Sequence, residues 1–183
     1  MLVLREARQF IDDAKAFREE ARAPEQQATL VFTDIVGTTK IWESLGTDFE
    51  PILRLHDDII IRFARRNNGY LVKNSGDSFF IAFERAGQAV QFALDAQKAL
   101  REAPWPPILK ECKGCEQGLL VRMGLHHGGV EIQRGEKGIV QDYFGPTVNR
   151  AARITRVSTG VKIVFSQSVL DEAKEMLDST QFS

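Results

Sequence analysis

Strand patterns and helix patterns alternate along this chain of 183 residues in an order that few folds accommodate. A buried strand at 28–34 precedes an amphipathic helix at 42–67. Two strands, at 70–73 and 78–83, are then joined by residues typical of a tight hairpin turn, and a second amphipathic helix spans 85–103. Because each amphipathic helix needs a sheet face to cover, this order predicts a mixed α/β fold, and within that broad class an α+β fold.

The second half of the chain continues the alternation after an irregular stretch. Residues 104–118 are rich in Pro, Gly and charge, and we expect an exposed loop there. Its Cys112 and Cys115 have the spacing of a redox motif but no strand-to-helix setting, so we assign them no chemistry. The remaining predicted elements are a strand pair in 119–133 around Gly128-Gly129, a strand at 139–144, a helix at 146–157, a strand at 161–165 and a helix at 169–177. The complete order predicts a mostly antiparallel sheet covered by helices.

The charge balance narrows the classes of partner. Lys plus Arg (24) and Asp plus Glu (25) nearly cancel, so no bulk positive field favours nucleic acid, and we expect no nucleic-acid partner. No apolar run reaches the roughly 18 residues that a membrane span needs. The first residues carry Arg5, Glu6 and Arg8 where a signal peptide needs apolar ones. We therefore expect a cytosolic protein.

The first 26 residues differ from the rest, and we expect them to form an amphipathic signalling helix with a linker. The apolar positions from Val3 to Ala21 alternate spacings of four and three, as in the seam of a coiled coil, and Pro24 ends the pattern. The segment is under three heptads long. It is compatible with pairing to a copy of itself and equally with a lone helix lying on its own domain.

Two aspartates lie at strand ends or turns beside glycine. Asp34 is the last residue of the first buried strand, and Asp77 lies in the predicted hairpin turn. Each alone fits an ordinary turn aspartate that caps local N–H groups. If the first strand neighbours the hairpin, however, both carboxylates reach one sheet edge, where magnesium takes carboxylate oxygens together with substrate phosphates. The pair therefore predicts a two-metal phosphoryl-transfer site.

Two further clusters could meet a phosphate or a sugar. Gly37-Thr38-Thr39 leads into a helix, so its backbone N–H groups could bind an anion, although the spacing is not that of a P-loop. Asn149 and Arg153 are four residues apart on a predicted helix and share one face. An amide and a guanidinium so placed can orient a sugar and neutralise a phosphate, but alone they also fit a solvated helix face.

These blocks together resemble the catalytic domain of class III nucleotidyl cyclases. The matching segments are FTDIVGTT at 32–39, KNSGDSF at 73–79, RMGLHHG at 122–128, and DYFG continuing through VN to AAR at 142–153. The resemblance covers about 28–177. It implies a ferredoxin-like βαββαβ core and a catalytic domain over 27–183, which lacks the C-terminal hairpin that family members commonly carry.

The resemblance also implies roles for single residues. Asp34, Asp77 and the backbone carbonyl of Ile35 would hold two magnesium or manganese ions. The other implied roles are purine reading by Lys73 and Asp142, ribose orientation by Asn149, stabilisation of the pentacoordinate phosphate by Arg153, and phosphate contacts from Gly37, Thr38, Thr39 and Arg122.

The purine pair favours ATP on chemical grounds. An ammonium at Lys73 can donate to adenine N1, and a carboxylate at Asp142 can accept from the 6-amino group, whereas guanine presents the opposite pattern. We therefore expect an adenylyl cyclase that converts ATP to cyclic AMP and pyrophosphate. A guanylyl cyclase that uses GTP is the first alternative, and a non-catalytic nucleotide-binding or dimerisation module is the second.

The family resemblance implies partners as well. Its active sites form between two domains, so a chain that carries both residue sets is expected to act as a homodimer. The leading helix implies an upstream sensor domain in a longer protein. Within the family the chain is similar to the cyclase domains of rhodopsin-linked cyclases from aquatic fungi, which implies a membrane photoreceptor as that sensor. Those cyclases are usually guanylyl-specific, so Lys73 and Asp142 depart from their pattern.

Overall fold

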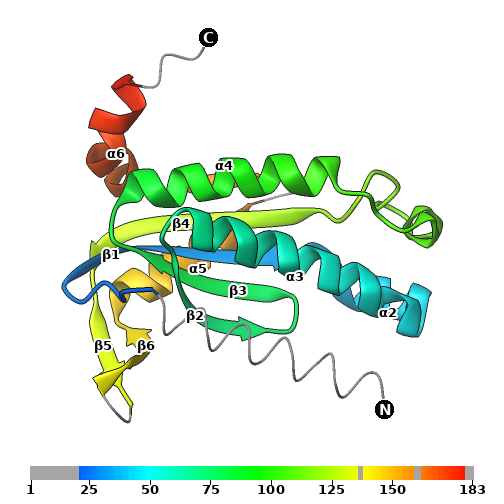
Figure 1. Ribbon diagram of the computed structural model, residues 1–183, viewed down its shortest axis with the longest axis horizontal. Helices are drawn as coiled ribbons and strands as arrows, with labels where there is room; N and C mark the ends of the chain where they lie inside the picture. The colour runs from blue at the N-terminus through cyan, green and yellow to red at the C-terminus, as the bar shows by residue number, and fades with distance from the viewer. Residues whose placement is uncertain (1–20, 136–137, 159–161, 180–183) are drawn as a thin grey trace.

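A twisted sheet with helices on both faces forms the body of the protein (Figure 1). The computed structural model describes residues 21–135, 138–158 and 162–179. The leading helix predicted before Ala21 lies outside the described residues. The sheet has the strand order β2-β3-β1-β4-β7, and its strands are β1 (Gln27–Ile35), β2 (Tyr70–Ser75), β3 (Ser78–Phe83), β4 (Val121–Gly129) and β7 (Ile163–Phe165).

The strand order confirms the predicted ferredoxin-like core. β1 lies between β3 and β4 and is antiparallel to both, and β2 pairs with β3 as the predicted hairpin. Among the described strands of this sheet, only β7 is parallel to its neighbour, which is β4. A separate two-stranded arm, β5 (Glu131–Arg134) with β6 (Val140–Phe144), projects from the main sheet (Figure 1).

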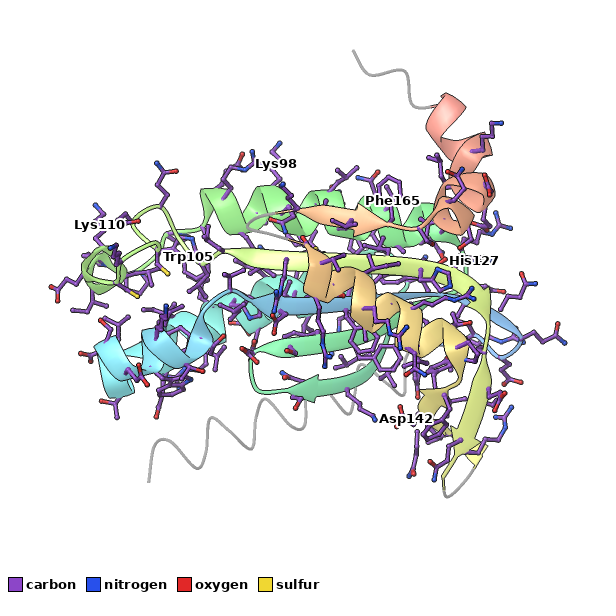
Figure 2. All side chains as sticks on the ribbon, turned by 180° about the vertical axis from the view of Figure 1, so that it is seen from behind. Lys98, Trp105, Lys110, His127, Asp142 and Phe165 are labelled. Carbon is purple, nitrogen blue, oxygen red and sulfur yellow. The ribbon has the colours of Figure 1, made fainter. Side chains whose placement is uncertain are left out.

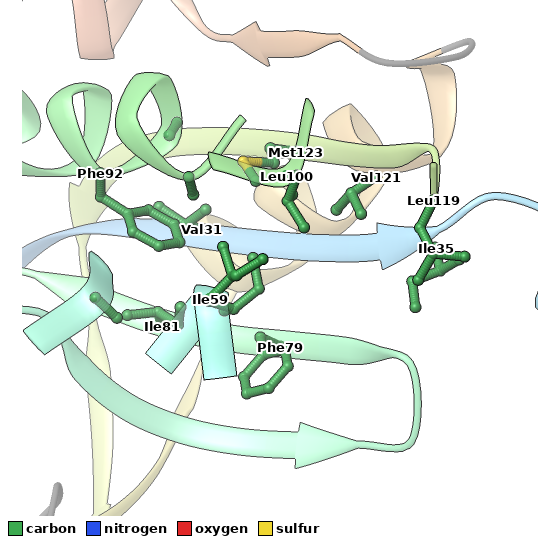
Figure 3. Close-up of a cluster of buried hydrophobic side chains, with 14 of the residues drawn as sticks. Val31, Ile35, Ile59, Phe79, Ile81, Phe92, Leu100, Leu119, Val121 and Met123 are labelled. Carbon is green, nitrogen blue, oxygen red and sulfur yellow. The ribbon is translucent and has the colours of Figure 1, made fainter. Parts of the chain in front are cut away.

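Two long helices cover one face of the sheet and bury its main core. α3 (Phe49–Arg66) and α4 (Ala86–Glu102) lie side by side on this face (Figure 1). Their apolar stripes meet alternate residues of the strands, so that Phe92 of α4 and Ile59 of α3 pack near Val31 of β1 (Figure 3). Full burial of such a side chain contributes about 1.5–3 kcal/mol, so this core supplies much of the driving force for folding.

The opposite face carries α5 (Pro146–Val157), which crosses β1 and β4 closely. Gly124 of β4 permits this approach, because a Cβ there would lie 2.2 Å from Thr155 Oγ1 and 2.4 Å from its backbone nitrogen. A second apolar cluster fills the same face near the arm, with Phe80 of β3 and Tyr143 of β6 among its members. The last helix, α6 (Gln167–Ser179), packs against α4 and β4.

The prediction of one continuous helix at 42–67 is wrong, because the structure has two helices there. α2 (Thr38–Leu45) ends at Gly46, and a 3-10 turn (Gly46–Asp48) redirects the chain into α3. Gly46 has φ 54°, a left-handed conformation that ends a helix and that glycine adopts without strain. The apolar periodicity continues through the break, because α2 and α3 both bury residues in the same core.

Two other predictions need correction. The loop at 104–118 contains a 3-10 helix (Pro107–Glu111), and both of its cysteines are buried in the main core rather than exposed. Backbone turns hold them there, with Cys115 N donating to Cys112 O at 3.0 Å. The strands predicted around Gly128-Gly129 exist, but they do not pair with each other, since β5 pairs with β6. No helix among the described residues is long and apolar enough to cross a membrane.

Candidate active site

A row of polar side chains crosses the sheet at the end of β1. Asp34 lies in register with Ser78 of β3 on one side and with Arg122 of β4 on the other. Ser78 is in turn opposite Ser75 of β2, and Asp77 occupies the hairpin turn beside it. Because directly opposed residues of neighbouring strands project from the same face, the row presents its polar groups together. Both predicted aspartates thus lie at one edge of the sheet.

The oxygens of the predicted metal ligands converge on two hydroxyl groups. Ser78 Oγ donates to Asp34 Oδ1 at 3.0 Å and lies 3.3 Å from Asp77 Oδ1. Thr38 Oγ1 lies 2.9 Å from the carbonyl oxygen of Ile35 and also contacts Asp77 Oδ2. The structure therefore brings together all of the oxygen ligands that the sequence predicts.

This oxygen set suits a hard divalent cation that also binds substrate. Magnesium is usually held by one or two carboxylates together with phosphate oxygens rather than by an all-protein cage. The described part of the chain has no group of three or more His, Cys, Asp or Glu side chains that could hold a metal by itself. Asp34, Asp77 and the Ile35 carbonyl thus fit magnesium or manganese bound together with a nucleotide.

Arg122, the predicted triphosphate contact, pairs with a predicted metal ligand. Its Nε donates to Asp34 Oδ2 at 2.6 Å, and its Nη2 contacts the same oxygen. The two side chains are 28% and 24% exposed, so both remain open to a ligand. To reach a phosphate, Arg122 must share or release the Asp34 carboxylate.

Gly37, Thr38 and Thr39, the predicted phosphate contacts, lie where the loop after β1 enters α2. Gly37 precedes α2 with φ 78°, and its carbonyl accepts from Lys40 N at 2.9 Å. The first N–H groups of a helix lack acceptors within the helix, so those of Thr38 and Thr39 are available to a phosphate. Val36 N donates to Leu120 O at 2.8 Å and fixes the loop to the start of β4.

The predicted purine-reading residues form an ion pair. Lys73 Nζ of β2 contacts Asp142 Oδ2 of β6, and the lysine side chain is 53% exposed while the carboxylate is 15% exposed. Asp142 Oδ1 also accepts from its neighbour's backbone, Tyr143 N, at 2.9 Å, which fixes its orientation. Figure 2 shows Asp142 on the arm, beside the helix α5. Main sheet and arm thus each supply one member of the pair.

A β-bulge in β2 aims Lys73 toward this pair. The register with β3 shifts between Leu71 and Lys73, so Val72 is an extra residue on the bulged strand. Val72 packs in the second cluster on the α5 face, and Lys73 follows it onto the same face to reach the arm. Without the bulge, strict alternation would turn Lys73 toward α3.

A hollow of about 320 Å³ lies beside the Lys73–Asp142 pair. Phe32 and Phe80 line it and stack on each other with ring centroids 4.3 Å apart. An aromatic wall with polar groups at its rim suits a planar base. Sequence reasoning did not identify these phenylalanines or Ser78, although the register of β1 with β3 would have revealed all three.

Asn149 and Arg153 lie on α5, which carries no other predicted site residue. Both are exposed on α5, one helical turn from each other. Within the part of the chain that the structure describes, no hydrogen bond or ion pair joins either of them to the metal or purine residues. One chain thus carries the metal ligands at the end of β1 and in the β2–β3 turn, and it also carries Lys73, Asp142, Asn149 and Arg153, which the family resemblance assigns to the other side of a shared site.

Comparison with known proteins identifies the family. The family model described as the adenylate and guanylate cyclase catalytic domain matches residues 21–183. The chain therefore belongs to this family, and its mixed fold with a mostly antiparallel sheet is that of class III cyclase domains.

The chain is similar to fungal adenylate cyclases in sequence and to an adenylate cyclase of Trypanosoma brucei in structure. The chain is 32% identical to an adenylate cyclase of Neurospora crassa and 36% identical to one of Mycosarcoma maydis, over 87% and 86% of its length. It spans 7% of the length of each of these two relatives. A structure of a Trypanosoma brucei adenylate cyclase in its monomeric state superposes with a TM-score of 0.75 at 28% identity, covering 82% of this chain and 77% of that one. The predicted likeness to rhodopsin-linked cyclases is confirmed for the fold. The guanylyl cyclase domain of the RhoGC fusion protein from the aquatic fungus Blastocladiella emersonii superposes with a TM-score of 0.70 at 23% identity, covering 82% of this chain and 86% of that one.

Proposed function

We propose that this chain is an adenylyl cyclase catalytic domain that converts ATP to 3',5'-cyclic AMP and pyrophosphate. The observation that carries the proposal is the Lys73–Asp142 ion pair beside the aromatic hollow. Its ammonium donates to adenine N1, and its carboxylate accepts from the 6-amino group. Guanine presents an N1–H to the ammonium and a carbonyl oxygen to the carboxylate, so neither group would gain a hydrogen bond to the base.

The reaction forms a bond between the ribose 3'-oxygen and the α-phosphorus and breaks the bond from that phosphorus to the pyrophosphate oxygen. Asp34, Asp77 and the Ile35 carbonyl would hold two magnesium or manganese ions. When bound, these ions favour ionisation of the 3'-hydroxyl and neutralise the triphosphate. Thr38 and Thr39 donate backbone N–H groups to phosphate oxygens, and Arg122 adds its positive charge there.

A second copy of the chain completes the site in this proposal. Asn149 would orient the ribose and Arg153 would stabilise the charge that develops on the α-phosphate. In this arrangement Lys73, Asp142, Asn149 and Arg153 of one copy act on a nucleotide whose metal ions are held by Asp34 and Asp77 of the other copy. The exposure of Asn149 and Arg153 on α5 supports it, because both side chains are open to a second chain. We also propose a cytosolic site of action and control by a sensor domain upstream of the leading helix, a photoreceptor being one candidate.

The test is the formation of cyclic product from ATP and from GTP, with magnesium or manganese, by wild type and by Asp77→Ala. We expect ATP to be preferred and the variant to lose at least about 100-fold in kcat, because a metal ligand is lost. Asp171→Ala, at an exposed position on α6, is the matched control and should keep full activity. Preference for GTP would make the domain a guanylyl cyclase, and unchanged activity of Asp77→Ala would exclude the metal mechanism.

Oligomeric state tests the shared site separately. Sedimentation over a range of concentrations should show a dimer whose formation parallels the specific activity. A strictly monomeric chain without activity would favour the non-catalytic signalling module.

A further inference from the structure

A buried polar pair on α3 packs against the β2–β3 hairpin, which carries Lys73 and Asp77. His56 is fully buried, and its Nδ1 lies 2.8 Å from Asp57 Oδ1. Asp57 is 7% exposed, and its burial raises the pKa of its carboxyl group while hydrogen bonds with His56 and Asn74 oppose that rise. Buried histidine and aspartate side chains in an otherwise apolar core need a reason to be there.

Two buried acceptors in this network have no hydrogen-bond partner among the described residues. They are His56 Nε2 and Asn74 Oδ1. A neutral imidazole that donates from Nδ1 to Asp57 leaves Nε2 as a bare acceptor, and an Asn74 amide that donates from Nδ2 to Asp57 leaves Oδ1 bare. When Asp57 is ionised it only accepts, so His56 and Asn74 must both donate to it, and each is left with one unsatisfied acceptor.

The bulge in β2 explains why Asn74 meets α3. Lys73 and Asn74 follow Val72, so the shift that sends Lys73 to the α5 face sends Asn74 to the opposite face. There Asn74 lies in register with Phe79, whose ring packs against His56 with centroids 5.8 Å apart. The network thus contacts β2 directly after the bulge, at the residue that follows Lys73.

We propose that Asp57, supported by His56, holds Asn74 and thereby locks the bulge that aims Lys73 at Asp142. These are positioning residues, since none of them touches the nucleotide. The lock determines base selectivity at a distance, because Lys73 discriminates ATP from GTP only while its ammonium is fixed beside Asp142. Loss of the lock frees the strand to return to regular alternation and lets the 53% exposed lysine swing away from the hollow. This inference rests on the proposed adenylyl cyclase function.

The decisive variant is Asp57→Leu, which replaces the carboxylate with an apolar side chain and so removes the acceptor. We expect the ratio of kcat/KM for ATP to that for GTP to fall about tenfold, as is usual when a support behind a site residue is lost. Binding of fluorescent α,β-methylene analogues of ATP and GTP, which are not cleaved, should show the same fall. Asn74→Ala should act alike, and the double variant should be no worse than either single one, because both break one contact. Asn74→Ala also keeps the test valid if Asp57→Leu does not fold.

Two controls separate positioning from general stability. Asp57→Asn keeps an oxygen for His56 and offers an N–H to Asn74 Oδ1 after the amide turns, so it should restore the ratio to within about threefold of wild type. Ile60→Ala, one turn along α3 and fully buried, should lower the melting temperature yet leave the ratio within about twofold.

The inference is overturned if Asp57→Leu and Asn74→Ala keep the wild-type selectivity in both assays, or if Ile60→Ala changes it as much as they do. Wild type that forms no cyclic product would contradict the proposed function, while the analogue-binding ratio would still test the lock. The two failures are therefore distinguishable.

Discussion

Gly124 gives the sharpest test of how the fold holds α5, the helix that carries Asn149 and Arg153. A Cβ at this position would lie 2.4 Å from the backbone nitrogen of Thr155, where ordinary contacts begin at 3.4 Å. In Gly124→Ala, α5 must therefore move outward by about 1 Å, because backbone cannot rotate out of the way as a flexible side chain can. Such overpacking costs about 1–3 kcal/mol in the free energy of unfolding.

The expected changes can be measured directly. For a domain of this size 1 kcal/mol shifts Tm by about 2–4 °C, so Gly124→Ala should melt about 2–12 °C below wild type. A displacement of 1 Å at a catalytic group can cost about 100-fold in rate, so we expect cyclic AMP formation to fall by roughly that factor. Thermal unfolding followed by circular dichroism and a product assay with ATP give both numbers.

Two other glycines of β4 supply matched controls. A Cβ at Gly128 would lie 3.0 Å from Thr147 Oγ1, and a Cβ at Gly129 would lie 3.8 Å from Gln26 O. Because all three changes add one methyl group to the same strand, the damage should follow the order of the clashes, with Gly129→Ala close to wild type. If Gly124→Ala is as stable and as active as Gly129→Ala, close packing of α5 on β4 does not position the helix.

Two further predictions concern buried polar groups. Burial raises the pKa of Cys115 to about 12, so its thiol should be alkylated far more slowly in the native protein at pH 7.5 than in urea. Mass spectrometry measures both alkylation rates, and equal rates would contradict the buried position. The phenol of Tyr143 donates to Pro24 O at 2.7 Å, so Tyr143→Phe leaves a buried carbonyl unsatisfied and should lower the free energy of unfolding by about 1–3 kcal/mol. A urea midpoint equal to that of wild type would refute this second prediction.

The fold could be predicted from the sequence because the informative signals are local. The apolar run of β1 and the turn residues before Ser78 depend on near neighbours, whereas the ferredoxin-like core that the order β2-β3-β1-β4 confirms was implied by the family resemblance. The break at Gly46 was missed because the apolar periodicity continues through it, so only the backbone conformation marks the end of α2. Burial of Cys112 could not be predicted either, since its position depends on turns that fold a polar segment back onto the core.

For the candidate site too, some residues could be predicted from the sequence and others could not. Asp34 and Asp77 could be predicted because carboxylates at strand ends are unusual, and the strand pairing then brings them together. The contact of Arg122 with Asp34 and the stack of Phe32 on Phe80 depend on which strands are neighbours and on their register. A period-two pattern does not specify either of these, since each strand could pair in another register.

The position of the bulge connects these observations. β2 must present Lys73 to the arm on one face and must also pack against α3 on the other, and a regular strand with Leu71 in the main core would turn Lys73 toward that core. One extra residue at Val72 resolves the conflict, because it shifts every later side chain of β2 to the other face. The same shift turns Asn74 inward, where a polar side chain needs a buried partner, and Asp57 on α3 provides it. A buried carboxylate in the core is therefore the structural counterpart of an exposed lysine beside the aromatic hollow.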